Sequence, residues 1–350
     1  MHKPTYTNEQ LAQLRQIADP LADQIVAHFF SQGRAPEFAQ LMAGAHQADW
    51  PAEVPAFLAQ TAQLPPWADP ELMARGCRFF EQRTQAIMSL LGFLSLPYCY
   101  AAADGAQVLY RSGRIVADTQ RRLAETAQFV LEVTDPLAFG PGGEGFVAVR
   151  KVRLMHAAVR YHIGQSGRWD AGLGQPINQE DMAGTNLAFS FIVIRGLRKV
   201  GIAVDHQDAL AYLHLWKVVG WLMGVQTDLL PDDERAAATL DQLIASRHFR
   251  KSAVGTELTA ALIQAINETF RDLPQGRLPG FVPAYFRFLL GDRVADLLGI
   301  APATWFAGKL VQTFNLVQSV QGGSGISRTE MIENIKRQYG KINFNVPEKI

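Results

Sequence analysis

Apolar residues recur at intervals of three and four along most of the chain, which is the spacing of one face of an α-helix. No stretch shows the alternation of apolar and polar residues that is typical of a half-buried strand. The first helix is predicted to open at the capping box Thr7-Asn8-Glu9-Gln10 and to bury a stripe of Leu11, Leu14, Ile17, Leu21, Ile25 and Phe29. The pattern predicts further helices near residues 36–46, 52–62, 70–94, 111–133, 145–164, 178–200, 206–226, 232–246, 254–271, 281–298, 303–319 and 328–338. We therefore predict an all-α protein.

Glycine and proline clusters separate these predicted helices. They lie at Leu64-Pro65-Pro66, Gly140-Pro141-Gly142-Gly143, Gly167 to Pro176, Leu230-Pro231, Pro274 to Pro279 and Gly322-Gly323-Ser324-Gly325. No repeat period divides the chain, and 350 residues can bury one large core. We therefore predict a single helical domain over residues 1–350.

One stretch, from Thr84 to Ala103, contains no charged side chain and is long enough to cross a bilayer. It also contains Pro97 and several small or polar residues, which weaken the case for a continuous span. We predict a buried core helix that ends near Leu94, with a membrane-associated segment as the alternative.

Composition narrows the range of partners and cofactors. The chain has 33 basic and 33 acidic residues, so it lacks the basic field that attracts nucleic acid. Its 48% hydrophobic and 19% charged residues suit a large interior or an apolar cavity. Cys77 and Cys99 are the only cysteines, which excludes a disulfide scaffold, a cysteine zinc site and covalent haem attachment through a Cys-x-x-Cys-His motif. The first residues lack the apolar run of a signal peptide, so we expect a cytoplasmic protein.

A histidine with an arginine on either side stands out in the predicted helix from Gly145 to Gly164. One stripe of this helix contains Phe146, Val149, Arg153, His156, Arg160 and Ile163. Neither arginine has an acidic residue three or four positions away, so no ion pair on the same helix explains them. If the stripe is buried, both arginines need an anion from elsewhere, because arginine is rarely buried unpaired.

Haem would meet these requirements, since imidazole is a common axial ligand of haem iron and arginine binds propionates well. Spacing alone does not distinguish haem from another anionic ligand. It is also compatible with a satisfied core histidine and with arginines that pair with acids on neighbouring helices.

The predicted helix from residue 111 to 133 carries a second candidate group. Its stripe comprises Ile115, Thr119, Arg122, Thr126, Phe129 and Val133. Arg122 and Thr126 lie one turn apart and could offer hydrogen bonds to dioxygen at an iron site. Glu125 lies beside them and could act as a base. The structural alternative is a helix whose arginine and threonines pack at an interface.

Three segments together resemble the rubber oxygenase family, which comprises latex-clearing proteins and the fungal mycophenolic-acid pathway oxygenase. They are Arg153-Leu-Met-His156-Ala-Ala-Val-Arg160, Pro176-Ile-Asn-Gln-Glu-Asp-Met-Ala-Gly-Thr185 and Leu213-His-Leu-Trp-Lys-Val-Val-Gly-Trp-Leu-Met-Gly224. The resemblance covers about residues 70–300, which leaves helical extensions at both ends. It implies a globin-like helical core with additional helices, one non-covalent b-type haem, and cleavage of a carbon–carbon double bond by dioxygen.

The resemblance also implies roles for single residues. His156 falls on the axial iron ligand, Arg153 and Arg160 on its flanking arginines, and Arg122 with Thr126 on the oxygen-side pair. Arg287 resembles an arginine near the end of the family's domain and is a candidate third partner of the propionates. Glu125 stands where latex-clearing proteins can carry a lysine, and an export signal is not evident. Both departures favour a smaller apolar substrate than rubber.

Other motifs are weaker. The segment Gly140 to Gly145 matches Gly-x-Gly-x-x-Gly, but it follows a predicted helix rather than a strand, so we expect a turn and no dinucleotide site. His-Glu-x-x-His and Glu-x-x-His are absent from the sequence, which argues against zincin and di-iron centres. Asn178, Glu180, Asp181 and Thr185 are expected to cap a helix or to support the haem pocket. His214 is expected to pack between helices.

The sequence thus predicts a haem-dependent oxygenase in which dioxygen attacks an alkene and Glu125 removes an allylic proton. No nucleic-acid partner and no integral membrane insertion are expected. Two alternatives stay open: a haem-binding sensor or carrier without turnover, and a haem-free helical protein whose arginines bind a different anion.

Overall fold

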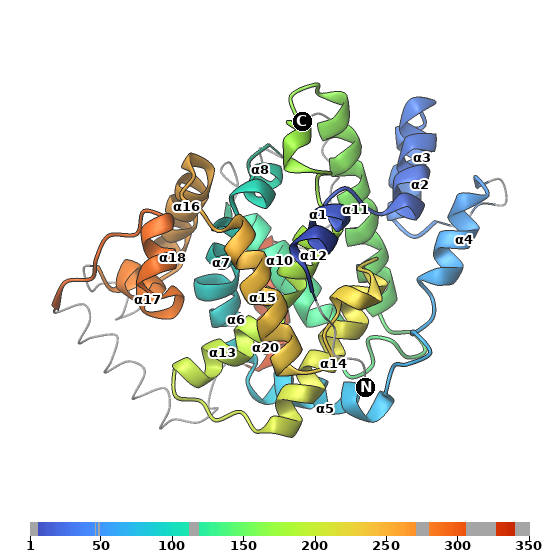
Figure 1. Ribbon diagram of the computed structural model, residues 1–350. Coiled ribbons are helices and arrows are strands. Elements are labelled where there is room, and N and C mark those ends of the chain that lie inside the picture. Colours follow the sequence, from blue (N-terminus) through green and yellow to red (C-terminus); the bar gives the residue numbers. More distant parts are fainter. Residues whose placement is uncertain are drawn as a thin grey trace.

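The computed structural model describes residues 6–45, 47, 50–111, 119–270, 280–305 and 327–339. Within these ranges the protein is all-α and contains no strand, which confirms the predicted fold class (Figure 1). The helices of the first half are α1 (Asn8–Leu14), α2 (Pro20–Ser31), α3 (Ala35–Met42), α4 (Glu53–Gln60), α5 (Pro70–Gln82), α6 (Thr84–Leu90), the π-helical turn η1 (Leu91–Ser95), α7 (Leu96–Tyr100), α8 (Ala103–Arg111), α10 (Thr119–Val133) and α11 (Gly145–Gln165). Those of the second half are η2 (Ala171–Leu173), α12 (Gln179–Phe189), α13 (Phe191–Lys199), α14 (His206–Leu222), η3 (Thr227–Leu229), α15 (Glu234–His248), α16 (Ala253–Phe270), α17 (Phe281–Leu290), α18 (Asp292–Leu297) and α20 (Arg328–Tyr339).

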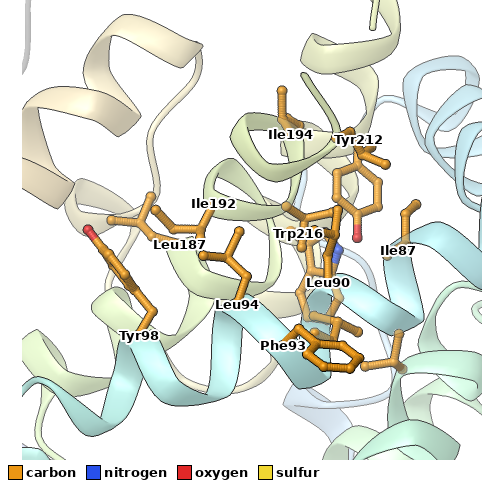
Figure 2. Close-up of a cluster of buried hydrophobic side chains, with 14 of the residues drawn as sticks. Ile87, Leu90, Phe93, Leu94, Tyr98, Leu187, Ile192, Ile194, Tyr212 and Trp216 are labelled. Atoms are coloured by element: carbon orange, nitrogen blue, oxygen red, sulfur yellow. The ribbon is translucent and has the colours of Figure 1, made fainter. Parts of the chain in front are cut away.

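The main core surrounds α12 and α14, which pack against each other near the centre of Figure 1. Helix α14 also runs along α5, and Gly76 permits their close approach, because a Cβ at this position would lie 2.6 Å from the carbonyl oxygen of Ala211. Hydrophobic residues from α6, η1, α7, α12, α13 and α14 fill the space between these helices (Figure 2). Burial of this apolar surface is the main favourable contribution to folding.

The segment from Thr84 to Ala103, which has no charged side chain, contributes to this core as a helical stretch that contains one π-helical turn. Leu90, Leu91 and Leu94 are buried, and the helix continues beyond Leu94, where the sequence predicted its end. Pro97 cannot donate a backbone hydrogen bond, and the π-helical turn just before it, closed by the Leu96 N–H to the Leu91 carbonyl, accommodates it. Among the residues described, no helix combines the length and the apolar composition that a bilayer span requires.

A smaller apolar cluster lies on the opposite side of α11. Helices α2, α3 and α4 bury Phe29, Phe38 and Phe57 there, together with Leu154 and Ala158 of α11. These three helices lie at the right-hand edge of the molecule in Figure 1, beyond α11. Helix α11 is therefore held between the main core and this N-terminal cluster.

Several predicted helices are interrupted in ways that periodicity does not reveal. The first stripe is divided between α1 and α2, because Asp19 caps α2 and Pro20 opens it. The predicted helix 70–94 is interrupted at Arg83, between α5 and α6. The predicted helix 178–200 breaks at Ser190, where the freed carbonyl of Phe189 accepts a hydrogen bond from Tyr212.

Three further predictions differ from the structure or fall partly outside the described residues. The predicted helix 281–298 breaks at Gly291, whose φ of 83° lies in the left-handed region that favours glycine. Helix α8 was not predicted. Of the predicted helix 303–319, residues 306–319 lie outside the described residues, as do residues 112–118 of the predicted helix 111–133.

Candidate active site

A cavity of about 330 Å³ lies between α7, α8, α10, α11, α12, α14 and α15. This volume falls within the range of pockets that bind small molecules. Most of its wall is apolar, and it includes Val108, Phe129, Met155, Val159, Met182 and Val219. Polar side chains form a smaller part of this wall, and their positions indicate the chemistry that the cavity supports.

His156 of α11 is one of these wall residues. Burial, assisted by the positive charges of Arg160 and Arg122, lowers the pKa of His156 from 6.5 to about 3. The ring is therefore neutral at neutral pH, which is the form that binds a metal. Its Nδ1 atom is buried and has no hydrogen-bond partner among the described residues. A buried polar atom without a partner is costly, and a ligand bound at this imidazole would account for it.

Arg153 and Arg160, the two arginines that flank His156, extend from α11 to acidic residues at the start of α2. Arg153 donates from Nε and Nη2 to the Asp19 carboxylate at 2.5 and 2.9 Å, and from Nη1 to the carbonyl of Leu222 at 3.2 Å. Arg160 donates from Nε to Asp23 at 2.7 Å, while its buried Nη2 has no partner within the described ranges. The anions that these arginines required are thus carboxylates of α2, and neither arginine is part of the cavity wall.

Helix α10 provides another part of the wall through Arg122, Glu125 and Thr126. The Arg122 guanidinium donates from Nη1 to Glu125 Oε2 at 2.7 Å, and Arg121 Nε lies 3.5 Å from the other oxygen of the same carboxylate. The Thr126 hydroxyl donates to the Arg122 carbonyl at 3.0 Å. The structure therefore brings His156 and the predicted oxygen-side group of α10 to one cavity.

The remaining predicted residues lie in other surroundings. Arg287 donates to Asp292, Asp296 and the carbonyl of Ile300, all within α17, α18 and the residues after them, and it is not part of the cavity wall. His214 accepts a hydrogen bond from the backbone N–H of Asp69 and packs edge-on against Trp67.

The segment Pro176 to Thr185 contains the start of a helix, as predicted. Asn178 accepts a hydrogen bond from the backbone N–H of Asp181 at the start of α12. Glu180 is fully buried and lies within ion-pair distance of Arg247, His248 and Arg15. These contacts hold α12 to α1 and α15 beside the cavity.

The segment Gly140 to Gly145 is a turn between α10 and α11, as expected, and Gly145 donates to the carbonyl of Ala138. A Cβ at position 143 would lie 2.0 Å from the Leu137 carbonyl oxygen, so this tight turn requires glycine there. Among the described residues, no cluster of three or more His, Cys, Asp or Glu side chains could hold a bare metal ion.

Two further features of the site were not predicted. Asp19 and Asp23 could have been noted as the start of a helix, but their partners lie 134 and 137 residues away. Tyr98 and Asp241 meet at the cavity wall although 143 residues separate them, and neither belongs to a recognisable motif.

The fold and the cavity define an all-α protein with a neutral imidazole on the wall of a largely apolar pocket. Comparison with known families then places it: residues 78–321, more than half of the chain, match the family model described as ER-bound oxygenase mpaB/B'/Rubber oxygenase, catalytic domain, and the chain belongs to this oxygenase family. It is 28% identical over 293 residues to the rubber oxygenase of Streptomyces sp. (strain K30), which covers 81% of this chain and 70% of that protein.

The fold is also similar to that of a solved structure. Latex clearing protein LCP in the closed state superposes with a TM-score of 0.80 at 24% sequence identity, covering 96% of this chain and 95% of the other. The resemblance to latex-clearing proteins noted in the sequence is therefore confirmed, and it extends to the helical architecture.

Proposed function

We propose that this protein is a b-type haem-dependent oxygenase that uses dioxygen to cleave a carbon–carbon double bond of an apolar, isoprenoid-like alkene. The observation that carries the proposal is the neutral imidazole of His156 on the wall of an apolar cavity that also presents Arg122, Glu125 and Thr126. The rubber oxygenase among its relatives supports an alkene as the substrate.

The residues present fit a haem group. His156 would bind the haem iron, because its ring is neutral and its buried Nδ1 lacks a partner among the described residues. Arg122 is a cation on the cavity wall that could meet a propionate or the oxygen side. Haem, when bound, would supply the binding and activation of dioxygen. Arg153 and Arg160 would act indirectly, by holding α11 against α2 so that His156 keeps its position.

The side chains of α10 would provide the polar chemistry. In an apolar cavity the Arg122 guanidinium stabilises developing negative charge more strongly than it would in water. Glu125 would remove the allylic proton of the substrate, and its ion pair with Arg122 holds the carboxylate at the wall. The Thr126 hydroxyl is directed to the Arg122 carbonyl, so it stabilises this turn of the helix.

A turnover experiment tests the proposal directly. The haem-reconstituted, reduced protein is mixed with dioxygen and a panel of terpenoid alkenes, and the products are analysed by mass spectrometry. We expect carbonyl compounds shorter than the substrate. A dioxygen-dependent change in the absorption spectrum with every alkene left intact would instead identify a non-catalytic haem sensor or carrier.

The substitution Glu125→Gln tests the base. Glutamine keeps the size of the side chain and can still accept from Arg122, but it cannot take up a proton. We expect the turnover rate to fall by about 10² to 10⁴ while haem binding is retained. The matched control is Glu132→Gln on the same helix, because Glu132 faces a different surface pocket. Equal turnover by the two variants would exclude Glu125 as the base.

A further inference from the structure

The cavity has a second polar group on the wall formed by α7 and α15. Tyr98 and Asp241 are only 8% and 7% exposed, and both line the cavity. The Tyr98 hydroxyl lies 2.9 and 3.0 Å from the two carboxylate oxygens of Asp241. Tyr98 belongs to the same core cluster as Tyr212 and Trp216, but Figure 2 shows its hydroxyl directed away from these two residues.

This pair carries a negative charge that is only partly compensated. The Arg195 guanidinium lies over the Tyr98 ring, 5.2 Å from its centroid, and its Nη1 is 3.7 Å from Asp241 Oδ2. Burial raises the pKa of Asp241, and Arg195 opposes this effect. Burial and the charge of Asp241 raise the pKa of Tyr98, so the phenol keeps its proton. The phenol is therefore the donor and the carboxylate the acceptor.

The hydrogen-bonding capacity of the pair determines which ligand it can hold. The single proton of the Tyr98 hydroxyl is directed to Asp241, which leaves unused acceptor positions on both groups. The pair can therefore accept a hydrogen bond from the cavity but has no proton left to donate. An anion such as a carboxylate would be repelled by Asp241. Arg195 reduces the attraction for an ammonium group, which leaves a neutral hydroxyl as the best match.

The position of the pair suits one end of an elongated molecule. Asp241 belongs to α15 and His156 to α11, two helices that both pack on α14, and the two side chains line the same cavity from these different helices. Apolar residues line the cavity near the pair, among them Met182, Ile244 and Phe249. A ligand whose hydroxyl meets Asp241 would thus place its hydrocarbon chain against this apolar lining.

We infer that the substrate is a long-chain unsaturated alcohol, whose hydroxyl group donates a hydrogen bond to Asp241 while its isoprenoid-like chain lies against apolar residues of the cavity wall. This inference rests on the proposed function, because it names the class of alkene that the oxygenase takes. It adds that the substrate is an amphiphile held by one polar end, rather than a hydrocarbon held by shape alone.

Calorimetric titration with farnesol and its methyl ether tests the inference. The two probes have nearly the same size and chain, but only farnesol can donate a hydrogen bond. We expect farnesol to bind about 10- to 100-fold more tightly, as for a hydrogen bond to a charged acceptor. Farnesoic acid should bind more weakly than either. Equal affinity for alcohol and ether, or no binding of farnesol, would overturn the inference.

Variants locate the effect. Asp241→Asn and Tyr98→Phe should each reduce the preference for farnesol over its ether by at least several-fold. The control is Tyr212→Phe. The Tyr212 hydroxyl is buried and donates a hydrogen bond to the Phe189 carbonyl, and Tyr212 does not line the cavity, so this variant should leave the preference for farnesol unchanged. If the preference persists in both cavity variants, the hydroxyl binds elsewhere and the inference is wrong.

The titrations are run on haem-free and on haem-loaded protein, and they require no turnover. A preference for the alcohol in a protein that takes up no haem would refute the proposed function and leave the binding site standing. Carbonyl products from alkenes, without any preference for the alcohol, would support the proposed function and refute the inferred hydroxyl-binding site.

Discussion

The His156→Ala protein is expected to fold and to retain no haem. The substitution removes the imidazole that we propose as the iron ligand, and alanine is well tolerated in the middle of helix α11. Without a bond to iron, the cofactor would be held by apolar contacts and Arg122 alone. The measurement is the absorption spectrum after reconstitution with haem and removal of the excess by gel filtration. Added imidazole should restore part of the bound haem, because it can occupy the space left by the side chain.

His162 provides the control for this experiment. It lies on the same helix and also has a buried ring nitrogen without a partner among the described residues, but it packs against Phe30 and Tyr161 and does not line the cavity. His162→Ala should therefore retain haem. Haem bound to His156→Ala with an unchanged spectrum would show that another residue is the ligand.

The Asp19→Asn protein is expected to lose about 3–5 kcal/mol of its free energy of unfolding, which is typical when one partner of a buried ion pair is removed. Arg153 and Asp19 have side chains only 6% and 4% exposed, so the unpaired guanidinium would remain buried. Asparagine caps a helix about as well as aspartate, so the cap of α2 is retained and the loss reports the charge. The free energy is obtained from urea unfolding of the haem-free protein.

A surface ion pair gives the comparison for this effect. Arg198 and Glu234 have side chains 42% and 21% exposed, and Glu234→Gln should cost about 0–1 kcal/mol. We also expect Asp19→Asn to weaken haem retention, because Arg153 holds α11 one turn before His156. A loss of stability no larger than that of Glu234→Gln would show that the pair does not hold α11 in place.

Much of the helical framework could be predicted from local pattern, because most of the helices bury one face and the spacing of three and four residues reflects that face. The interruptions could not, because long-range contacts produce them. The break at Ser190 is stabilised by Tyr212, which is 23 residues from the carbonyl that it binds. The turn before Pro97 depends on a π-helical hydrogen bond that no periodicity encodes.

The candidate site was predictable to a different degree for different residues. The spacing of residues on two predicted helices indicated His156 on one and Arg122 with Thr126 on the other, and the family resemblance assigned all three to an iron site. The structure brings them to the same cavity. The sequence also indicated that Arg153 and Arg160 need anions from elsewhere. It could not show that these anions are carboxylates of α2, because pairing across more than 130 residues depends on the packed fold.

The absorption spectrum of the purified wild-type protein after addition of haem tests the central claim most directly. The account predicts a Soret band that stays with the protein through gel filtration, at one haem per chain, and that His156→Ala abolishes. A wild-type protein that shows no Soret band after reconstitution would contradict the account, and its cavity would then bind something other than haem.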